Sequence, residues 1–300
     1  MNRCSPSECS LPLNSQCKAP VQIQLFNYNE VPHFLKGNPY VTGGYPSLPS
    51  LHLCMRSLLA WTNETVNVWS HLLGFLVFLG LCLWDNIVWM PSINGSFTDR
   101  VILTIGLLCY QFCMLASTGY HLFRCHSETA CNKWLALDLT GISVGLLGCY
   151  LPGIHLGFYC LSVWRDVYLL VIGGLFVAVF IFQTQPKYYS DNWFRRRLVL
   201  YCFLTGYGVI PAVHWVYLNG GLSAPVVQMF APKIAVVYLL GLLAFFFYVS
   251  KFPEKVFPGR FNFIGSSHQM WHVVVVVAFV WWHHSGQLLL MYRLGQPCNN

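Results

Sequence analysis

The sequence predicts an all-α membrane protein with seven transmembrane helices. Of its 300 residues, 56% are hydrophobic and only 9% are charged, whereas soluble domains carry about 25% charged residues. The mean hydropathy is +0.52. Seven separate apolar stretches have about the 20-residue length that a helix needs to cross the hydrocarbon core. A chain with so few charges requires a non-aqueous environment around most of its length.

The first 62 residues are expected to form a cytosolic arm. Residues 1–50 are rich in Pro, Ser, Asn and Gly without clear periodicity, which predicts a mostly irregular chain. Residues 1–20 are polar and lack the apolar segment of a cleavable signal peptide. Residues 51–62 are too short to span a membrane, and Arg56 together with Trp61 predicts a short helix that lies in the interface.

The seven apolar stretches lie within the predicted membrane domain, residues 63–292, and a luminal tail of residues 293–300 follows it. The third and fourth stretches are the shortest. Gly141, Gly145 and Gly148 place small residues along the third stretch, which favours close packing against a neighbouring helix. The stretches run over residues 67–90, 101–123, 134–152, 166–185, 198–218, 229–250 and 267–291.

The distribution of basic residues predicts the orientation, because cytoplasmic loops hold the excess of Lys and Arg. Of the 17 such residues, 13 fall on the side of the arm, and the other four are Arg100, Arg165, Lys233 and Arg293. The N-terminus is therefore expected in the cytosol and the C-terminus in a lumen. This arrangement is the reverse of that in G-protein-coupled receptors and argues against that class. The net charge of +7 forms no dense basic block, so no nucleic-acid partner is expected.

Four ionisable residues inside the predicted spans are candidates for function, because such groups are costly in a membrane. His121 lies near the end of the second span, Asp138 near the start of the third, and His268 and His272 at the start of the seventh. Since the second span runs towards the cytosol and the other two run away from it, all four are expected at similar depth. That common depth near the cytosolic boundary predicts one shared site.

This set of residue types is typical of an open zinc site. His268 and His272 are spaced i, i+4 and share a helix face, and a third imidazole from another helix completes a three-histidine ligand set. Ser117 lies one turn before His121, and Asp138 is expected to serve as a carboxylate behind the ligands or as a group that binds water. A pair of histidines at this spacing is by itself a weak signal. His214, His283 and His284 are interpreted as ordinary interfacial histidines.

The predicted topology also separates the cysteines by redox compartment. Cysteines on the cytosolic side are expected to remain reduced thiols. Cys160 and Cys298 are the two that the topology places on the luminal side. Because that side is oxidising and offers neither residue another partner, the two are predicted to form a disulfide.

Several blocks of the sequence, taken together, resemble the progestin and adipoQ receptor (PAQR) family over roughly residues 25–298. The blocks are Asn63–His71 (NETVNVWSH), Ser117–His121 (STGYH), Leu137–Ile142 (LDLTGI), Gly208–Pro211 (GVIP) followed by His214, Pro253–Gly259 (PEKVFPG) and Ser267–His272 (SHQMWH). The resemblance implies a seven-helix fold with a cytosolic N-terminus and a zinc ion held by three histidines. In this sequence the three histidines are His121, His268 and His272, and the family's Asp and Ser positions are Asp138 and Ser117.

Within that family, residues 38–45 of the arm and residues 293–298 of the tail most resemble a Golgi-resident member. The resemblance implies a multi-pass Golgi membrane protein whose cytosolic arm binds a Raf-type protein kinase. By holding the kinase on the Golgi, such a protein damps the MAP-kinase cascade. A spatial regulator of signalling is therefore the preferred functional hypothesis.

Two alternatives use the same predicted zinc site. The first is a ceramidase-like zinc amidohydrolase that acts on a membrane lipid held in the helix-bundle cavity, in which Asp138 and Ser117 assist the reaction. The second is a receptor that senses a ligand in that cavity. The intact histidine set is compatible with a hydrolase, but a structural zinc ion uses the same ligands.

Overall fold

The computed structural model describes residues 23–296 and 298, and over these residues the chain is almost entirely helical. Seven helices in this part of the chain are long and apolar enough to span a membrane, as predicted. The spans are α2 (Thr65–Trp84) with its extension through a π-helical turn (Asp85–Trp89) and α3 (Met90–Ser92), α4 (Phe97–Phe123), α5 (Glu128–Gly157), α6 (Ser162–Gln183), α7 (Phe194–Tyr207) with α8 (Val209–Leu218), α9 (Pro225–Ser250) and α10 (Ser267–Leu294).

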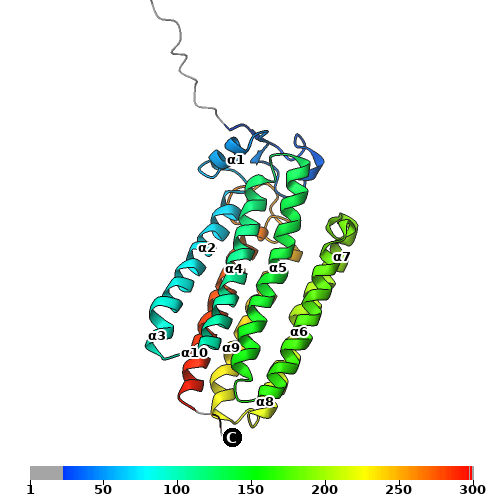
Figure 1. Ribbon diagram of the computed structural model, residues 1–300. Coiled ribbons are helices and arrows are strands. Elements are labelled where there is room, and N and C mark those ends of the chain that lie inside the picture. Colours follow the sequence, from blue (N-terminus) through cyan, green and yellow to red (C-terminus); the bar gives the residue numbers. More distant parts are fainter. Residues whose placement is uncertain (1–22, 297, 299–300) are drawn as a thin grey trace, which may run out of the picture.

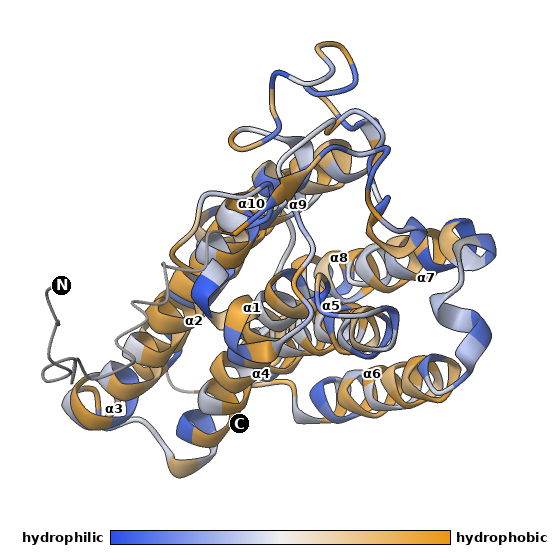
Figure 2. Cartoon of the chain, turned by 90° about the horizontal axis from the view of Figure 1, so that it is seen from above, coloured by the Kyte–Doolittle hydropathy of each residue, from blue (hydrophilic) through white to orange (hydrophobic). Residues whose placement is uncertain are grey.

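The helices run up and down in one bundle, with the arm at one end and the end of α10 at the other (Figure 1). Seen along the bundle, α5 lies in the interior, where it packs against α4, α6 and α10 (Figure 2). The helices are coloured mainly as hydrophobic and the connecting loops are more hydrophilic, as expected for a bundle that lipid surrounds.

The third span corrects a prediction. It was expected to be among the shortest and to end at residue 152, but α5 is the longest helix, with 30 residues. Ser127 caps its start through a bond from the Ala130 amide to the Ser127 hydroxyl (3.2 Å). At the other end the helix continues past Pro152, because the Tyr110 hydroxyl donates to the Gly148 carbonyl (3.1 Å) that proline leaves without its helical partner.

The small residues of α5 allow close packing, as predicted. A Cβ atom added to Gly148 would lie 2.6 Å from the Cβ of Cys109 on α4, and one added to Gly145 would lie 2.8 Å from the ring of Phe279 on α10. At Gly141 the added atom would be 3.2 Å from the Cα of Cys113, so the two backbones almost touch. Close approach of α4 and α5 brings the histidine-bearing end of α4 to the centre of the bundle.

The described part of the arm is folded, which differs from the irregular chain expected. Strand β1 (Leu25–Phe26) pairs antiparallel with β2 (Tyr45–Pro46) around a 3₁₀ turn at His33–Leu35. A small core of Val31, Leu35, Val41 and Tyr45 lies between them. Four apolar side chains spread over fifteen residues show no periodicity, so sequence pattern alone did not indicate this unit.

The predicted interfacial helix is present but shorter than residues 51–62. Helix α1 covers Leu51–Ser57, with Ser50 accepting a bond from the Leu53 amide (3.3 Å) at its start. Its apolar side chains Leu51 and Met55 are exposed. The chain then turns to begin α2, because the Thr65 hydroxyl bonds to the Thr62 amide (2.7 Å) and to the Ala60 carbonyl (2.8 Å). These bonds end the short helix early.

At the end of the bundle opposite the arm, Cys160 and Cys298 form the predicted disulfide, with their Cα atoms 5.3 Å apart. The bond joins the loop between α5 and α6 to the segment that follows α10. The division of the chain into arm, membrane domain and tail, and the side of the membrane that each end faces, remain predictions.

Candidate metal centre

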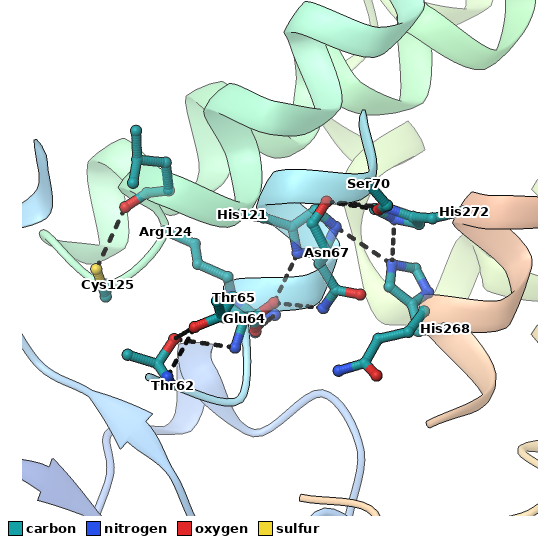
Figure 3. Close-up of polar contacts among 12 residues, drawn as sticks. Thr62, Glu64, Thr65, Asn67, Ser70, His121, Arg124, Cys125, His268 and His272 are labelled. Carbon is teal, nitrogen blue, oxygen red and sulfur yellow. Dashed lines mark hydrogen bonds and ion pairs between the residues drawn. The ribbon is translucent and has the colours of Figure 1, made fainter. Parts of the chain in front are cut away.

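Three histidine side chains meet at the end of the bundle that carries the arm. His121 comes from the last turn of α4, and His268 and His272 come from the first two turns of α10. The Nε2 atom of His268 lies 3.3 Å from Nε2 of His121 and 3.2 Å from Nε2 of His272. The three form a group that can hold a metal ion, and their ligand atoms all lie within 4.8 Å of one another (Figure 3).

The spacing fits a tetrahedral ion. Imidazole nitrogens that bind such an ion at about 2.0–2.1 Å lie roughly 3.3 Å from one another. The two Nε2–Nε2 separations, 3.2 and 3.3 Å, match that geometry. His121 and His272 are almost fully buried, at 2% and 1% exposure, so a buried cation here would replace lost hydration with three nitrogen ligands.

Hydrogen bonds to the other ring nitrogens determine which tautomers are present. The Nδ1 atom of His121 lies 2.7 Å from a carboxylate oxygen of Glu64, and Nδ1 of His272 lies 3.1 Å from the carbonyl oxygen of Asn67. Both of these oxygens are acceptors, so both Nδ1 atoms carry the proton. The Nε2 lone pairs of these two histidines therefore face the centre, which is the arrangement that metal binding requires.

Glu64 is the most connected residue of this site. Besides the contact with His121, its carboxylate accepts from the Arg124 guanidinium (2.9 Å) and from the Asn67 side chain (2.7 Å). Burial alone would raise the pKa of the Glu64 carboxyl, but the charge of Arg124 and the hydrogen bonds from His121 and Asn67 outweigh burial and hold that pKa well below its usual range. Glu64 is therefore ionised and fixes the ring of His121 in place (Figure 3).

The start of α10 is held in a similar way by Glu254, which is fully buried. Its carboxylate accepts from the Ser267 backbone amide (2.7 Å) and from the Ser267 hydroxyl. A carboxylate at a helix N-terminus satisfies free amides and interacts favourably with the helix dipole. The same carboxylate accepts from Asn38 of the arm (2.9 Å), which links the arm to the helix that carries His268 and His272.

The structure brings Ser117 and Asp138 to the same cavity as the three histidines. The carboxylate bonded to His121 belongs to Glu64 (2.7 Å), and the expected role of Asp138, behind the ligands or on a water molecule, stays a prediction. Asp138 lines the cavity beside Ser117.

Sequence reasoning did not identify Glu64 or His71 as members of this site. Glu64 directly precedes α2. Its position as an acid at the edge of the first span, near the depth of the histidines, is the sequence feature that could have identified it. The His71 ring stacks on that of His272, with centroids 3.7 Å apart, and is 3% exposed. The sequence spacing of His71 does not relate it to the other histidines, because His71 lies on α2 and contacts His272 on α10 only in the folded bundle.

A cavity of about 1130 Å³ opens from the histidine group into the bundle. Its lining extends along α5 from Leu135 to Gly157 and so runs through most of the bundle. Most of the lining residues are apolar or aromatic. A cavity of this shape suits a molecule with a long apolar part.

Comparison with known proteins agrees with the fold. The model of the family described as haemolysin-III related matches residues 59–283. Progestin and adipoQ receptor family member 3 of mouse is 51% identical over 280 residues, covering 93% of this chain and 90% of the relative. The human protein of the same name is 50% identical over the same shares. The adiponectin receptor protein of Drosophila melanogaster is 29% identical and is covered over 60% of its length. A seven-helix bundle with three converging histidines, matched over these lengths, places the chain in the progestin and adipoQ receptor family of haemolysin-III-related proteins.

Proposed function

We propose that this protein is a spatial regulator in the Golgi membrane that binds a Raf-type kinase through its cytosolic arm and thereby restrains MAP-kinase signalling. The similarity to family member 3 carries the proposal, because it extends over 93% of this chain. The excess of basic residues on the side of the arm supports a cytosolic orientation. The disulfide at the other end supports a luminal environment there.

The packing of the arm supports a docking role. The Thr42 amide donates to Asn262 (2.8 Å), and the Gly259 amide donates to the Tyr40 carbonyl (3.0 Å), so the arm is attached to the loop between α9 and α10. The Leu48 amide donates to the Cys125 carbonyl (3.1 Å) in the loop after α4. The described part of the arm and the loops therefore form one continuous folded surface on which a kinase can bind.

Removal of residues 1–62 is expected to release the kinase from the Golgi to the cytosol, because the arm is the largest cytosolic segment of the proposed topology. The measurement is the share of Raf-type kinase that co-localises with a Golgi marker in cells expressing the variant. Arg165→Glu, at the opposite end of the bundle, is the control and should recruit normally. If the deletion variant still reaches the membrane and still recruits the kinase, the loops and not the arm bind the kinase.

The cavity favours a second candidate function, a zinc-dependent hydrolysis of a lipid amide. We propose zinc as the ion, since a buried set of three neutral imidazoles with an open fourth position is characteristic of catalytic zinc sites. When bound, zinc polarises a carbonyl and activates water. Asp138 and the three histidines line the same cavity, where the Asp138 carboxylate can take a proton from water and return it to a leaving amine. A ligand-sensing receptor uses the same cavity without turnover.

Asp138→Asn separates these functions, because it keeps the size of the side chain and removes the base. Zinc content should remain near that of the parent, while any ceramide turnover should fall about 100-fold or more. Kinase recruitment should be unchanged. The three quantities are measured on one preparation by metal analysis, lipid product analysis and kinase binding. Zinc-loaded parent protein that turns over no ceramide would eliminate the hydrolase.

A further inference from the structure

Two free cysteine side chains lie in contact at the end of the bundle that carries the arm. The Sγ atoms of Cys54 and Cys125 are 3.8 Å apart, and both residues are buried. Cys54 belongs to the short helix α1, and Cys125 follows the last turn of α4, next to Arg124 (Figure 3). The two positions are 71 residues apart in the sequence, so only the fold brings these thiols together.

The pair lies where the arm is attached to the end of α4. The Leu48 amide of the arm donates to the Cys125 carbonyl (3.1 Å), and the Leu48 carbonyl oxygen lies 3.8 Å from the Cys54 sulfur. Leu48, Cys54 and Cys125 together form one small buried core. The residue before Cys125 is Arg124, whose guanidinium bonds to Glu64 (2.9 Å). A covalent bond between the two sulfurs therefore fixes α1 and the arm to the end of α4 beside the histidine group.

The chemical setting of the two thiols favours oxidation. A hydrogen bond from the Cys125 thiol lowers the pKa of Cys54, and the thiolate is the form of cysteine that reacts with peroxide. A second thiol beside the first converts the initial oxidation product into a disulfide. Since a disulfide bond is about 2.05 Å long, the two sulfurs have to approach by about 1.8 Å.

Access to the buried pair comes through α1. This helix has only seven residues, which is too short to be stable by itself. Its Leu51 and Met55 side chains are exposed, so few contacts within the protein hold that face of the helix. Short segments of this kind open locally more often than the whole fold unfolds. Opening of α1 exposes Cys54 to a small oxidant and lets its sulfur move towards Cys125.

We propose that Cys54 and Cys125 are a peroxide-sensitive thiol pair, which closes to a reversible disulfide and locks α1 to the end of α4. In the first step the Cys54 thiolate attacks hydrogen peroxide, so that an S–O bond forms, the O–O bond breaks and hydroxide leaves. In the second step the Cys125 sulfur attacks the resulting sulfenic acid, an S–S bond forms, and the hydroxyl group leaves with the Cys125 proton as water. The hydroxide takes up the proton that Cys54 released on ionisation. Two thiols and one peroxide thus give one disulfide and two water molecules.

Two electrons pass from the sulfurs to the peroxide in this reaction, and a thiol such as glutathione returns them by thiol–disulfide exchange. The pair is therefore reduced in a reducing compartment and closes only when peroxide is present. The reaction depends neither on metal in the histidine group nor on kinase binding.

The proposal is tested on the purified full-length protein with hydrogen peroxide as the oxidant. Remaining thiols are alkylated under denaturing conditions, and the Cys54–Cys125 peptide pair is measured by mass spectrometry after digestion. Its linked fraction should rise about 10-fold or more with peroxide and return to the starting value with glutathione. The peptide pair of the Cys160–Cys298 disulfide is the internal standard.

Single substitutions assign the two roles. Cys125→Ser should leave Cys54 as a sulfenic acid that dimedone labels, because the second thiol is missing. Cys54→Ser should give about 10-fold less label on Cys125. Cys131→Ser is the matched control, since Cys131 is also buried near the arm but its thiol donates to the Phe34 carbonyl (3.7 Å). In this control the link between Cys54 and Cys125 should form as in the parent.

The lock itself is measured by limited proteolysis within residues 47–62. Oxidised parent protein should be cleaved there about 10-fold more slowly than reduced protein, because the link suppresses the opening that cleavage requires. Peroxide should not change the cleavage rate of Cys125→Ser.

Two results would overturn the proposal. The first is a parent protein in which peroxide produces no Cys54–Cys125 peptide pair while dimedone labels other cysteines, a result that does not depend on the folding of any variant. The second is a linked parent protein that is cleaved within residues 47–62 as fast as the reduced protein, which would mean that the disulfide does not restrain α1.

Discussion

Alanine in place of any one of His121, His268 or His272 is expected to lower metal affinity by about 100-fold or more. Changes to groups behind metal ligands typically cost about 10–100-fold, and each of these histidines supplies one of three ligands. The purified parent protein should hold about one ion per chain. Metal content is measured by elemental analysis after gel filtration, and affinity by competition with a chelator.

The matched control is His214→Ala. This histidine accepts from or donates to the Tyr168 hydroxyl (2.9 Å) and packs on Trp164, so it is an engaged histidine outside the metal group. It should lose no metal. Stoichiometric metal in any of the three single variants would contradict the ligand assignment, and a parent protein that is folded but free of metal would remove the site altogether.

Glu64→Ala is expected to destabilise the protein by about 3–5 kcal/mol, because it leaves the Arg124 guanidinium without its carboxylate partner in a buried position. It also frees the outer nitrogen of His121, so metal affinity should fall about 10–100-fold even in protein that stays folded. Thermal unfolding in detergent, with added metal and with chelator, measures the first effect. Chelator competition measures the second.

Variants of neighbouring residues test the physical cause. Glu64→Gln keeps acceptors for His121 and Arg124 and should have a smaller effect on both quantities. The double variant Glu64→Ala with Arg124→Leu should recover part of the lost stability, since no buried charge remains unpaired. Glu30→Ala, an exposed acid of the arm, is the control. Unfolding and metal affinity of Glu64→Ala equal to those of the parent would show that this carboxylate supports neither helix packing nor the histidine group.

Much of the architecture follows from composition and spacing. Apolar stretches long enough to cross a bilayer must be helical, because a helix satisfies its own backbone hydrogen bonds. Because the second span runs towards the cytosol and the seventh runs away from it, His121 was predicted at the same membrane depth as His268 and His272. The error in the length of α5 has a definite cause: Pro152 is a helix breaker in water, but the Tyr110 hydroxyl satisfies the carbonyl that the proline leaves free.

Side-chain partners across helices could not be predicted in the same way. Glu64 bonds to His121 across 57 positions of sequence, and Asn38 bonds to Glu254 across 216. Neither pair has a periodic signature, since each depends on how two segments approach in three dimensions. The arm core of Val31, Leu35, Val41 and Tyr45 is similar, because its members meet only after the chain has turned back on itself.

The sequence by itself determined the class of fold, the number of spans, the depth of the histidines and the disulfide partners, because hydrophobic length and helical period are local properties of the chain. Only the tertiary structure decided that Glu64 bonds to His121 and that the His71 ring stacks on His272. These facts depend on the rotation and contact of packed helices. A hydrophobic pattern constrains helix rotation only weakly when lipid and protein interior are equally apolar.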